Sequence, residues 1–208
     1  MLAEGKAWAD LSHLSIITVT GDDRIKWLHD LTTQHLLNIA SGDWLPAMIL
    51  DHNGHVEYQF NLVDDGTTTF IVIDPSYAEG LLAYLLKMRF MLKVDAADSS
   101  SEYAVLRAPG QPNEIGGPYA LVPRGELDEM KKVFNENAKE VGTWSLDAER
   151  VATGRPRHGV DTDHKTIPNE IGVLNKDVHM NKGCYRGQET VAKVFNLGAP
   201  PRRLVMLH

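Results

Sequence analysis

The residues best suited to chemistry lie in one short stretch, Lys182–Thr190, which reads KGCYRGQET and holds the only cysteine of the chain, Cys184. Its basic neighbours, Lys182 and Arg186, favour the thiolate form, and a helix over Gln188–Phe195 would add its N-terminal dipole. Because the thiolate is the reactive form of cysteine, Cys184 is the candidate catalytic residue. The alternative is a structural cysteine in a glycine-bounded turn.

A nucleophilic cysteine usually works with a base, most often a histidine. His179 precedes Cys184 by five residues, and His158 and His164 lie further upstream. Their spacing matches no cysteine-protease signature. Redox or sulfur chemistry without a Cys–His dyad is therefore favoured over a dyad.

The nine histidines raise the question of a metal site. Nitrogen and oxygen ligands gather around Asp51, His52 and His55, and again around residues 161–164. Neither group has the spacing of a zinc site, and one cysteine cannot hold an iron–sulfur cluster within a single chain. We expect no structural metal.

The stretch KGCYRGQE matches the signature of the YgfZ-type folate-binding proteins, which are related to the aminomethyltransferase (T-protein) of the glycine cleavage system. The chain from Arg150 to His208 resembles the same family in its R-x-x-x-G-x-P-R segment, the signature and the N-x-G that follows. VTGDDRIKWLHDLTTQHL and the D-x-x-G turn at Asp51–Gly54 resemble the family's first helix and hairpin. Residues 99–142 carry nothing diagnostic.

The resemblance implies a folate-binding accessory protein that supports iron–sulfur cluster assembly or repair and thereby tRNA modification. Its implied cofactor is tetrahydrofolate or a derivative, and its implied partners are iron–sulfur proteins or their assembly machinery. Cys184 would stand at the rim of the folate cleft, with Tyr185 stacking on the ligand and Lys182 attracting a glutamate tail. The predicted ligand-binding residues are Lys182, Gly183, Tyr185, Arg186, Gly187, Gln188, Glu189, Trp144 and Arg150.

Two departures from the family pattern bear on this expectation. T-proteins use an Asp in a hairpin strand for methylene transfer, and Tyr58 and Gln59 occupy the matching positions here. Neither side chain is a carboxylate, which argues against glycine cleavage activity and leaves open whether the protein is an enzyme. Folate-binding relatives also carry a Glu that pairs with the pterin ring, where this chain has Ala152.

Two other functions stay open. One is a one-carbon transferase acting on an unidentified amine donor, against which the missing hairpin carboxylate counts. The other is a ligand-free interaction scaffold, which Ala152 favours.

Hydrophobic periodicity predicts an α+β fold built from ferredoxin-like split βαβ units, as in the T-protein and YgfZ fold. The first unit spans residues 1–97 and the second, with the cysteine motif, spans 98–208. In the first unit we expect helices over 22–32 and 75–90, the former capped by Thr20, and strands at 16–19, 44–50, 56–63, 68–73 and 91–94. In the second we expect strands at 103–108 and 119–122 and helices over 126–140, 145–151 (capped by Ser145) and 188–195. A further strand begins at Leu204, where relatives continue into a C-terminal β-barrel that we expect to be absent or truncated.

Composition and charge narrow the functional classes. The chain has 208 residues, with 43% hydrophobic and 24% charged residues, which is typical of a soluble globular protein. No apolar run approaches 18 residues, so no membrane partner is expected, and the single cysteine fits a reducing cytoplasm. The net charge of −7 divides into −12 over residues 1–149 and +5 over 150–208. The positive charge of residues 150–208 favours an anionic ligand near the cysteine. The absence of a Lys/Arg tract argues against direct nucleic-acid binding.

Overall fold

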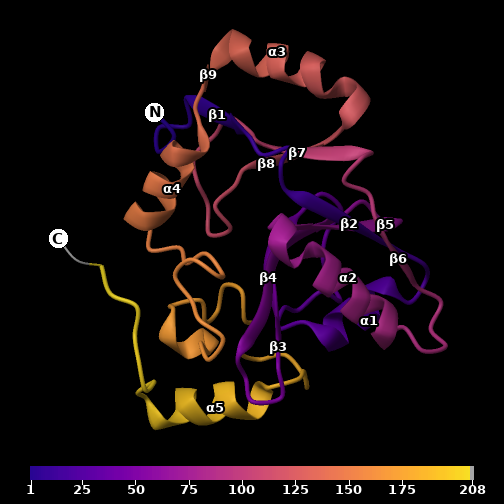
Figure 1. Cartoon of the computed structure of the whole chain (residues 1–208), viewed down its shortest axis with the longest axis vertical. Coiled ribbons are helices and arrows are strands. Elements are labelled where there is room, and N and C mark those ends of the chain that lie inside the picture. Colours follow the sequence, from indigo (N-terminus) through magenta and orange to yellow (C-terminus); the bar gives the residue numbers. More distant parts are fainter. Residues whose placement is uncertain (207–208) are drawn as a thin grey trace.

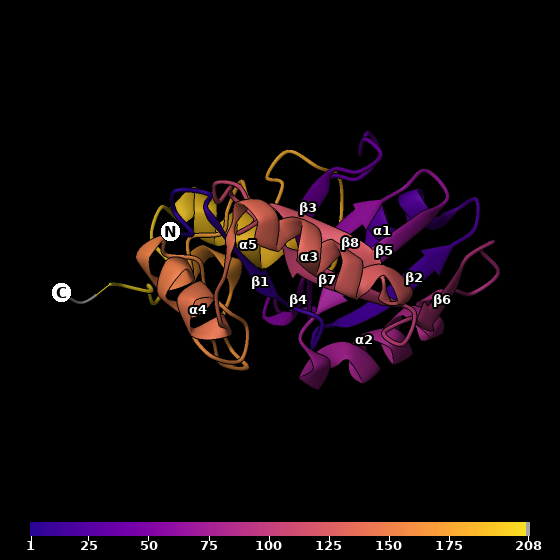
Figure 2. The ribbon, with the colours of Figure 1, turned by 90° about the horizontal axis from the view of Figure 1, so that it is seen from above.

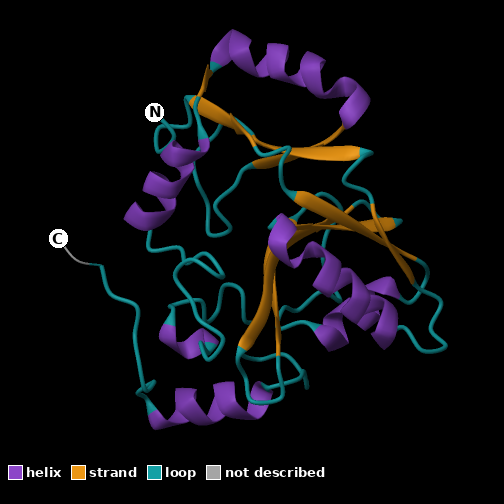
Figure 3. Ribbon diagram, viewed as in Figure 1, coloured by secondary structure: helices purple, strands orange, loops and turns teal. Residues whose placement is uncertain are grey.

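The computed structural model describes residues 1–206 and contains two β-sheets, five α-helices and a long loop region between the last two helices (Figures 1 and 3). The larger sheet has the strand order β3-β4-β5-β2-β6, and every neighbouring pair is antiparallel. Its strands are β2 (Ser15–Thr20), β3 (Trp44–Leu50), β4 (Val56–Asp64), β5 (Thr68–Ile73) and β6 (Asp95–Asp98).

Helices α1 (Arg24–Leu31) and α2 (Pro75–Met88) cover one face of this sheet (Figure 1). The strands alternate between their two faces, as the two-residue period of a β-strand requires. In β5, Ile71 and Ile73 pack against the helices, whereas Phe70 and Val72 face away from them. The face opposite the helices is therefore also apolar and packs against the second sheet.

The smaller sheet has the order β8-β7-β1-β9 and is built from β1 (Ala7–Asp10), β7 (Tyr103–Arg107), β8 (Tyr119–Pro123) and β9 (Lys139–Glu140). Strand β1 pairs antiparallel with β7 and parallel with β9. Helix α3 (Leu127–Asn137) lies across its outer face, as Figure 2 shows. Trp8 of β1 is fully buried there and donates its ring N–H to Asn135 of α3 over 3.0 Å.

The C-terminal third is mostly loop between α4 (Thr143–Ala152) and α5 (Gln188–Leu197), with one short 3-10 turn at Pro168–Glu170. Hydrogen bonds fasten this loop to the segment that follows α1. Thr33 donates its hydroxyl to the Asp177 carbonyl over 2.6 Å, and the Gln34 amide donates to the Lys176 carbonyl over 2.7 Å. The loop is thereby held against the larger sheet.

The predicted α+β architecture is confirmed, and most elements begin and end within two residues of their expected bounds. The strand expected over residues 91–94 is wrong. That segment forms turns after α2, with the Lys93 amide bonded to the Asp23 carboxylate, and β6 starts only at Asp95, where it pairs with Thr20. Strand β1 was not predicted, and it lies in the sheet formed by the second half of the chain. The division of the chain at residue 97 stays a prediction.

The helix ends differ from the expectation in three places. Thr20 does not cap α1, because it belongs to β2, and the N-cap position is Asp23. Ser145 lies inside α4, whose N-cap is Gly142. Helix α3 ends at Asn137, since the chain then extends to form β9.

Among residues 1–206, no helix is both long and apolar enough to cross a membrane. Residues 204–206 form no strand, and residue 207, the remainder of the predicted final strand, lies outside the described part of the chain.

Candidate functional site

Lys182 is the first residue of the cysteine motif, Lys182–Glu189, and its side chain is buried. Its ammonium group donates to the carbonyl oxygens of His29 and Thr32 at the C-terminal end of α1, where helix carbonyls lack partners within the helix. Burial lowers the pKa of Lys182 to about 8. The amine therefore closes a helix end in this structure, and its predicted contact with a ligand tail stays a prediction.

Tyr185 and Arg186 fix the motif to the larger sheet. Tyr185 is buried among Met48, Leu50 and Val191, and burial raises its pKa to about 12. Arg186 donates to the Leu50 carbonyl and forms an ion pair with Glu57 of β4. Contacts within the protein therefore hold both side chains in place.

Gly187 brings α5 against the turn between β3 and β4. It precedes the first residue of α5 with φ +80°, and a Cβ added there would lie 2.5 Å from the Asp51 carbonyl oxygen and 2.8 Å from the Gly54 Cα. A Cβ on Gly54 would in turn lie 2.8 Å from Thr190. Glycine is therefore needed on both sides of this contact. Gln188 and Glu189 form the first turn of α5, and the Gln188 amide reaches the Lys182 carbonyl at 3.4 Å.

Cys184 and the adjacent Gly183 are exposed, and Cys184 carries a free thiol. His179, one of the histidines considered as its base, lies in a row of three histidine rings. His179 stacks on His35, with ring centroids 5.2 Å apart, and His35 lies 4.9 Å from His29. Within residues 1–206, no group of three or more histidine, cysteine or acidic side chains is arranged to hold a metal ion.

A cavity of about 260 Å³ lies between the two sheets. Its walls come from β4, β5, β7, β8, α4 and the loop over residues 155–158. Gln59 and Asn61 of β4 reach it because they alternate with Phe60 and Leu62, which pack beneath the helices. Aromatic rings of Trp44 and Tyr119, 5.3 Å apart, form part of the wall.

Each carboxylate of the cavity wall is matched with an arginine. Asp74 accepts from Arg157 at 2.7 Å and Asp147 accepts from Arg150 at 2.7 Å. The third pair joins Glu149 to Arg107, whose closest atoms are 3.6 Å apart, beyond hydrogen-bond distance. The side chain of Arg107 is only 1% exposed.

Unpartnered polar atoms concentrate in this cavity. Six buried side-chain nitrogen or oxygen atoms of residues 1–206 lack a hydrogen-bond partner, and four of them belong to cavity-lining residues: Asn61 Oδ1, Arg107 Nε, Arg107 Nη2 and Glu149 Oε1. The nearby Tyr119 hydroxyl donates elsewhere, to the Ile115 carbonyl over 3.1 Å. Because buried polar atoms in proteins are nearly always bonded, these atoms mark a place for a polar ligand or for water.

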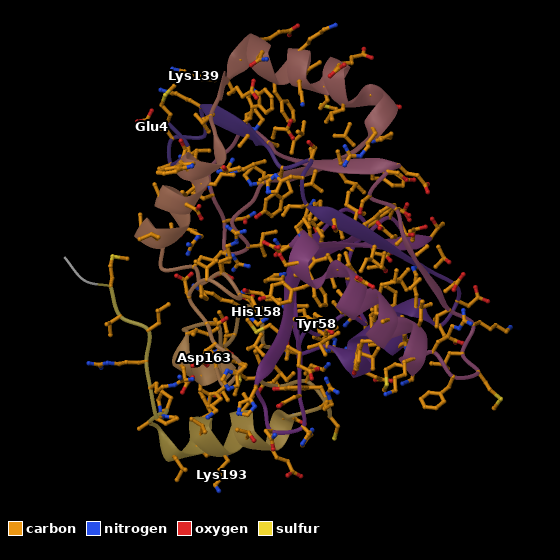
Figure 4. The ribbon with its side chains drawn as sticks, viewed as in Figure 1. Glu4, Tyr58, Lys139, His158, Asp163 and Lys193 are labelled. Carbon is orange, nitrogen blue, oxygen red and sulfur yellow. The ribbon has the colours of Figure 1, made fainter. Side chains whose placement is uncertain are left out.

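A second hollow, an outer groove of about 490 Å³, lies between β4 and the loop over residues 158–164. Figure 4 labels Tyr58, His158 and Asp163, which line it. Tyr77 and His158 line both hollows, and their rings lie 4.6 Å apart. This ring pair therefore separates the cavity from the groove. Burial lowers the pKa of His158.

Of the predicted site residues, only Arg150 lines the cavity. There it pairs with Asp147 and with Asp161 at 2.5 Å. Trp144 is 90% exposed on α4 and is not among the cavity-lining residues. The residues of Lys182–Glu189 line neither hollow.

Sequence reasoning missed the three unpartnered residues of the cavity. The one available signal was Arg107, a charged residue at the end of the strand sequence YAVLR. At the hairpin positions without a carboxylate, the Gln59 amide donates to the buried Asp177 carboxylate over 3.0 Å. Ala152 is exposed in the last turn of α4.

Comparison with known proteins agrees with the predicted resemblance. No family model matches the chain. It is 22% identical over 244 residues to a putative chloroplastic transferase of Arabidopsis thaliana, covering 98% of this chain and 56% of the relative. It is 22% identical over 229 residues to a mitochondrial iron–sulfur cluster assembly factor homolog of Mycosarcoma maydis (96% and 56%), and 22% identical over 230 residues to the tRNA-modifying protein YgfZ of Colwellia psychrerythraea (96% and 70%).

The fold is similar to that of the glycine cleavage system aminomethyltransferase T from Bartonella henselae. The TM-score is 0.76 at 14% identity, over 94% of this chain and 66% of that one. The predicted resemblance to YgfZ-type proteins and to T-protein is thereby confirmed. The chain spans little more than half the length of the chloroplastic and mitochondrial relatives.

Proposed function

We propose that this protein binds a reduced folate and supports iron–sulfur cluster assembly or repair, and through it tRNA modification. Relatives named for iron–sulfur cluster assembly and for tRNA modification support this role. The aminomethyltransferase fold supports the folate as ligand.

The observation that carries the proposal is the set of unpartnered buried atoms around the cavity between the sheets. A folate has a flat ring with N–H and carbonyl groups, and such a ring needs both hydrogen-bond acceptors and donors. The cavity offers acceptors on Asn61 and Glu149, donors on Arg107, and the rings of Trp44 and Tyr119. These residues fit the ligand and would hold its ring, which carries one-carbon units when reduced.

The electrostatics of the cavity favour binding over acid–base catalysis. A general base must be free to take a proton, but the carboxylates of Asp74 and Asp147 are each hydrogen-bonded to an arginine. Hydrogen bonds from Arg157 and from the start of α2 hold the pKa of Asp74 below its usual value despite burial. We therefore propose an accessory protein in preference to a methylene transferase.

Cys184 has a separate role in this proposal. It is exposed, and the buried or paired side chains of Lys182, Tyr185 and Arg186 hold its loop in place. A thiol at the surface can reach a protein partner, whereas none of the described cavity-lining residues comes from its loop. We propose that the Cys184 thiol contacts iron–sulfur proteins or their assembly machinery. The predicted location of the protein is the cytoplasm.

Two measurements test the two halves of the proposal. Calorimetric titration of tetrahydrofolate into the protein and into Cys184→Ala should give micromolar binding in both. Cells that lack the native copy should recover iron–sulfur enzyme activity with the wild type and fail to recover it with Cys184→Ala. Absence of folate binding would refute the first half, and full recovery with Cys184→Ala would refute the second.

A further inference from the structure

The cavity contains a buried ion pair whose two charged groups are not hydrogen-bonded to each other. Arg107 of β7 donates from one nitrogen, Nη1, to the carbonyls of Ala108 and Gly110, at 2.6 and 2.8 Å. Its Nε and Nη2 have no hydrogen-bond partner, although the Glu149 carboxylate lies 3.6 Å from Nη2. Desolvation of both charges is costly, and a pair with loose geometry regains little of that cost. The wall of the cavity therefore contains two charged groups with unused hydrogen-bonding capacity.

Asn61 completes the set from a third element. It lies on β4, Arg107 on β7 and Glu149 on α4, so the three line the cavity from both sheets and from the helix. The carboxylate oxygens and the Asn61 carbonyl oxygen accept hydrogen bonds, and the guanidinium donates. A carboxylate can accept two parallel N–H groups at once.

We infer that Glu149, with Asn61 and Arg107, binds the amino-oxo edge of the ligand's ring. This inference rests on the proposed folate function and names the residues that recognise the folate. The edge in question is a pyrimidine ring with an amino group, a neighbouring ring N–H and a carbonyl. Glu149 accepts the N–H groups, and Arg107 donates to the carbonyl.

Glu149 can accept the N–H groups of the ring because of its position on α4. The glutamate that folate-binding relatives carry falls at Ala152, which is exposed and is not among the cavity-lining residues. Glu149 precedes Ala152 by three residues, about one helical turn earlier, and unlike Ala152 it lines the cavity. Glu149 therefore offers the cavity a carboxylate where Ala152 offers none, and Arg107 faces it from the sheet.

Binding assays with three probes test this inference. The probes are 5-formyltetrahydrofolate, p-aminobenzoylglutamate, which lacks the ring, and guanosine, which has the same amino-oxo edge without the tail. Glu149→Gln keeps the shape of the side chain and removes its charge. The matched control is Glu129→Gln, which removes an exposed glutamate from α3.

We expect Glu149→Gln to weaken the binding of 5-formyltetrahydrofolate at least tenfold, the size expected for losing a charge-assisted hydrogen bond. Binding of p-aminobenzoylglutamate should not change, and Glu129→Gln should match the wild type. Because Glu149→Gln leaves the Arg107 charge buried beside a neutral amide, the double variant Arg107→Gln/Glu149→Gln is measured as well. It contains neither charge, and because it also lacks the donor to the ring carbonyl it should lose at least as much affinity.

The outcomes separate this inference from the proposed function. Folate affinity within twofold of the wild type in folded Glu149→Gln and in the double variant would overturn the inference alone. Failure of the wild type to bind either folate or guanosine would overturn both. Binding of guanosine alone, lost in Glu149→Gln, would support the recognition of the ring edge and refute folate as the ligand.

Discussion

Replacing Gly187 with alanine tests how the cysteine motif is held to the larger sheet. Gly187 has φ +80°, and a Cβ there would meet three backbone atoms of the 51–54 turn between 2.5 and 3.0 Å. Backbone atoms cannot rotate away, so α5 or the turn must shift. We expect the contact to loosen and the protein to lose stability.

The magnitude follows from two contributions. A left-handed conformation costs a residue with a Cβ roughly 1–2 kcal/mol. Forcing extra volume into a packed site adds about 1–3 kcal/mol. Gly187→Ala should therefore lower the free energy of unfolding by about 2–5 kcal/mol.

The same helix provides a matched control. Gly198 ends α5 with φ +76°, and a Cβ there would meet nothing within 4 Å. Gly198→Ala should thus show only the conformational cost of roughly 1–2 kcal/mol. The reduced entropy of the unfolded chain affects both variants alike and cancels in the comparison.

Urea unfolding followed by far-UV circular dichroism measures both variants. The rate at which Cys184 is alkylated in the native protein should also change in Gly187→Ala, because its loop precedes the displaced helix. Equal destabilisation of the two variants, within about 0.5 kcal/mol, would show that the close contact at Gly187 carries no energy and would refute the reasoning.

Three further predictions concern the surroundings of the motif. Burial lowers the pKa of Lys182 to about 8, below its unfolded value, so the unfolded chain binds more protons between about pH 8 and 10.5. Across that range the unfolding free energy of the wild type should rise with pH relative to Lys182→Met. Burial, followed by the nearby Lys182 charge, lowers the pKa of His29, whose Nδ1 accepts from the Leu36 amide over 3.2 Å. Stability should therefore fall as pH drops below about 6.5, and less steeply in His29→Gln, as measured by thermal unfolding at several pH values. Arg202 donates to Asp163 at 2.7 Å and also to Glu170 of the 3-10 turn. Arg202→Met should therefore speed limited proteolysis of residues 200–206. An unchanged cleavage rate would show that these hydrogen bonds do not hold the segment.

Local patterns explain why much of the larger sheet was predictable. Asn53-Gly54 predicted the hairpin between β3 and β4, where the Gly54 amide donates to the Asp51 carbonyl and Gly54 has φ +86°. The β-branched run at 68–73 specified β5, and Asp74-Pro75 specified the start of α2, where the Asp74 carboxylate accepts from the Ser76 amide over 3.0 Å. Each of these signals acts within a few residues.

The unpredicted strands depend on distant partners. Strand β6 reads DAAD and β9 is the exposed pair Lys139–Glu140, and neither sequence favours a strand. They are extended because β2 and β1 offer them free edges. No local pattern contains that information.

The candidate site was predictable in one of its two parts. The cysteine motif is contiguous, so its residues could be named together. The cavity residues Asn61, Arg107 and Glu149 are spread over three elements and are ordinary in their own segments. Only the packing of the two sheets brings them together and leaves their atoms unpartnered.

Strand β1 has a consequence for how the chain folds during synthesis. Its partners, β7 and β9, begin 93 or more residues after its last residue, Asp10. Trp8, fully buried in the native protein, must therefore stay unpaired while the whole larger sheet is made. Pairings of such long sequence separation are slow to form, because the loop must close before the contact stabilises it. The larger sheet can thus assemble first, with β1 joining last as the strand that locks the second sheet to the first.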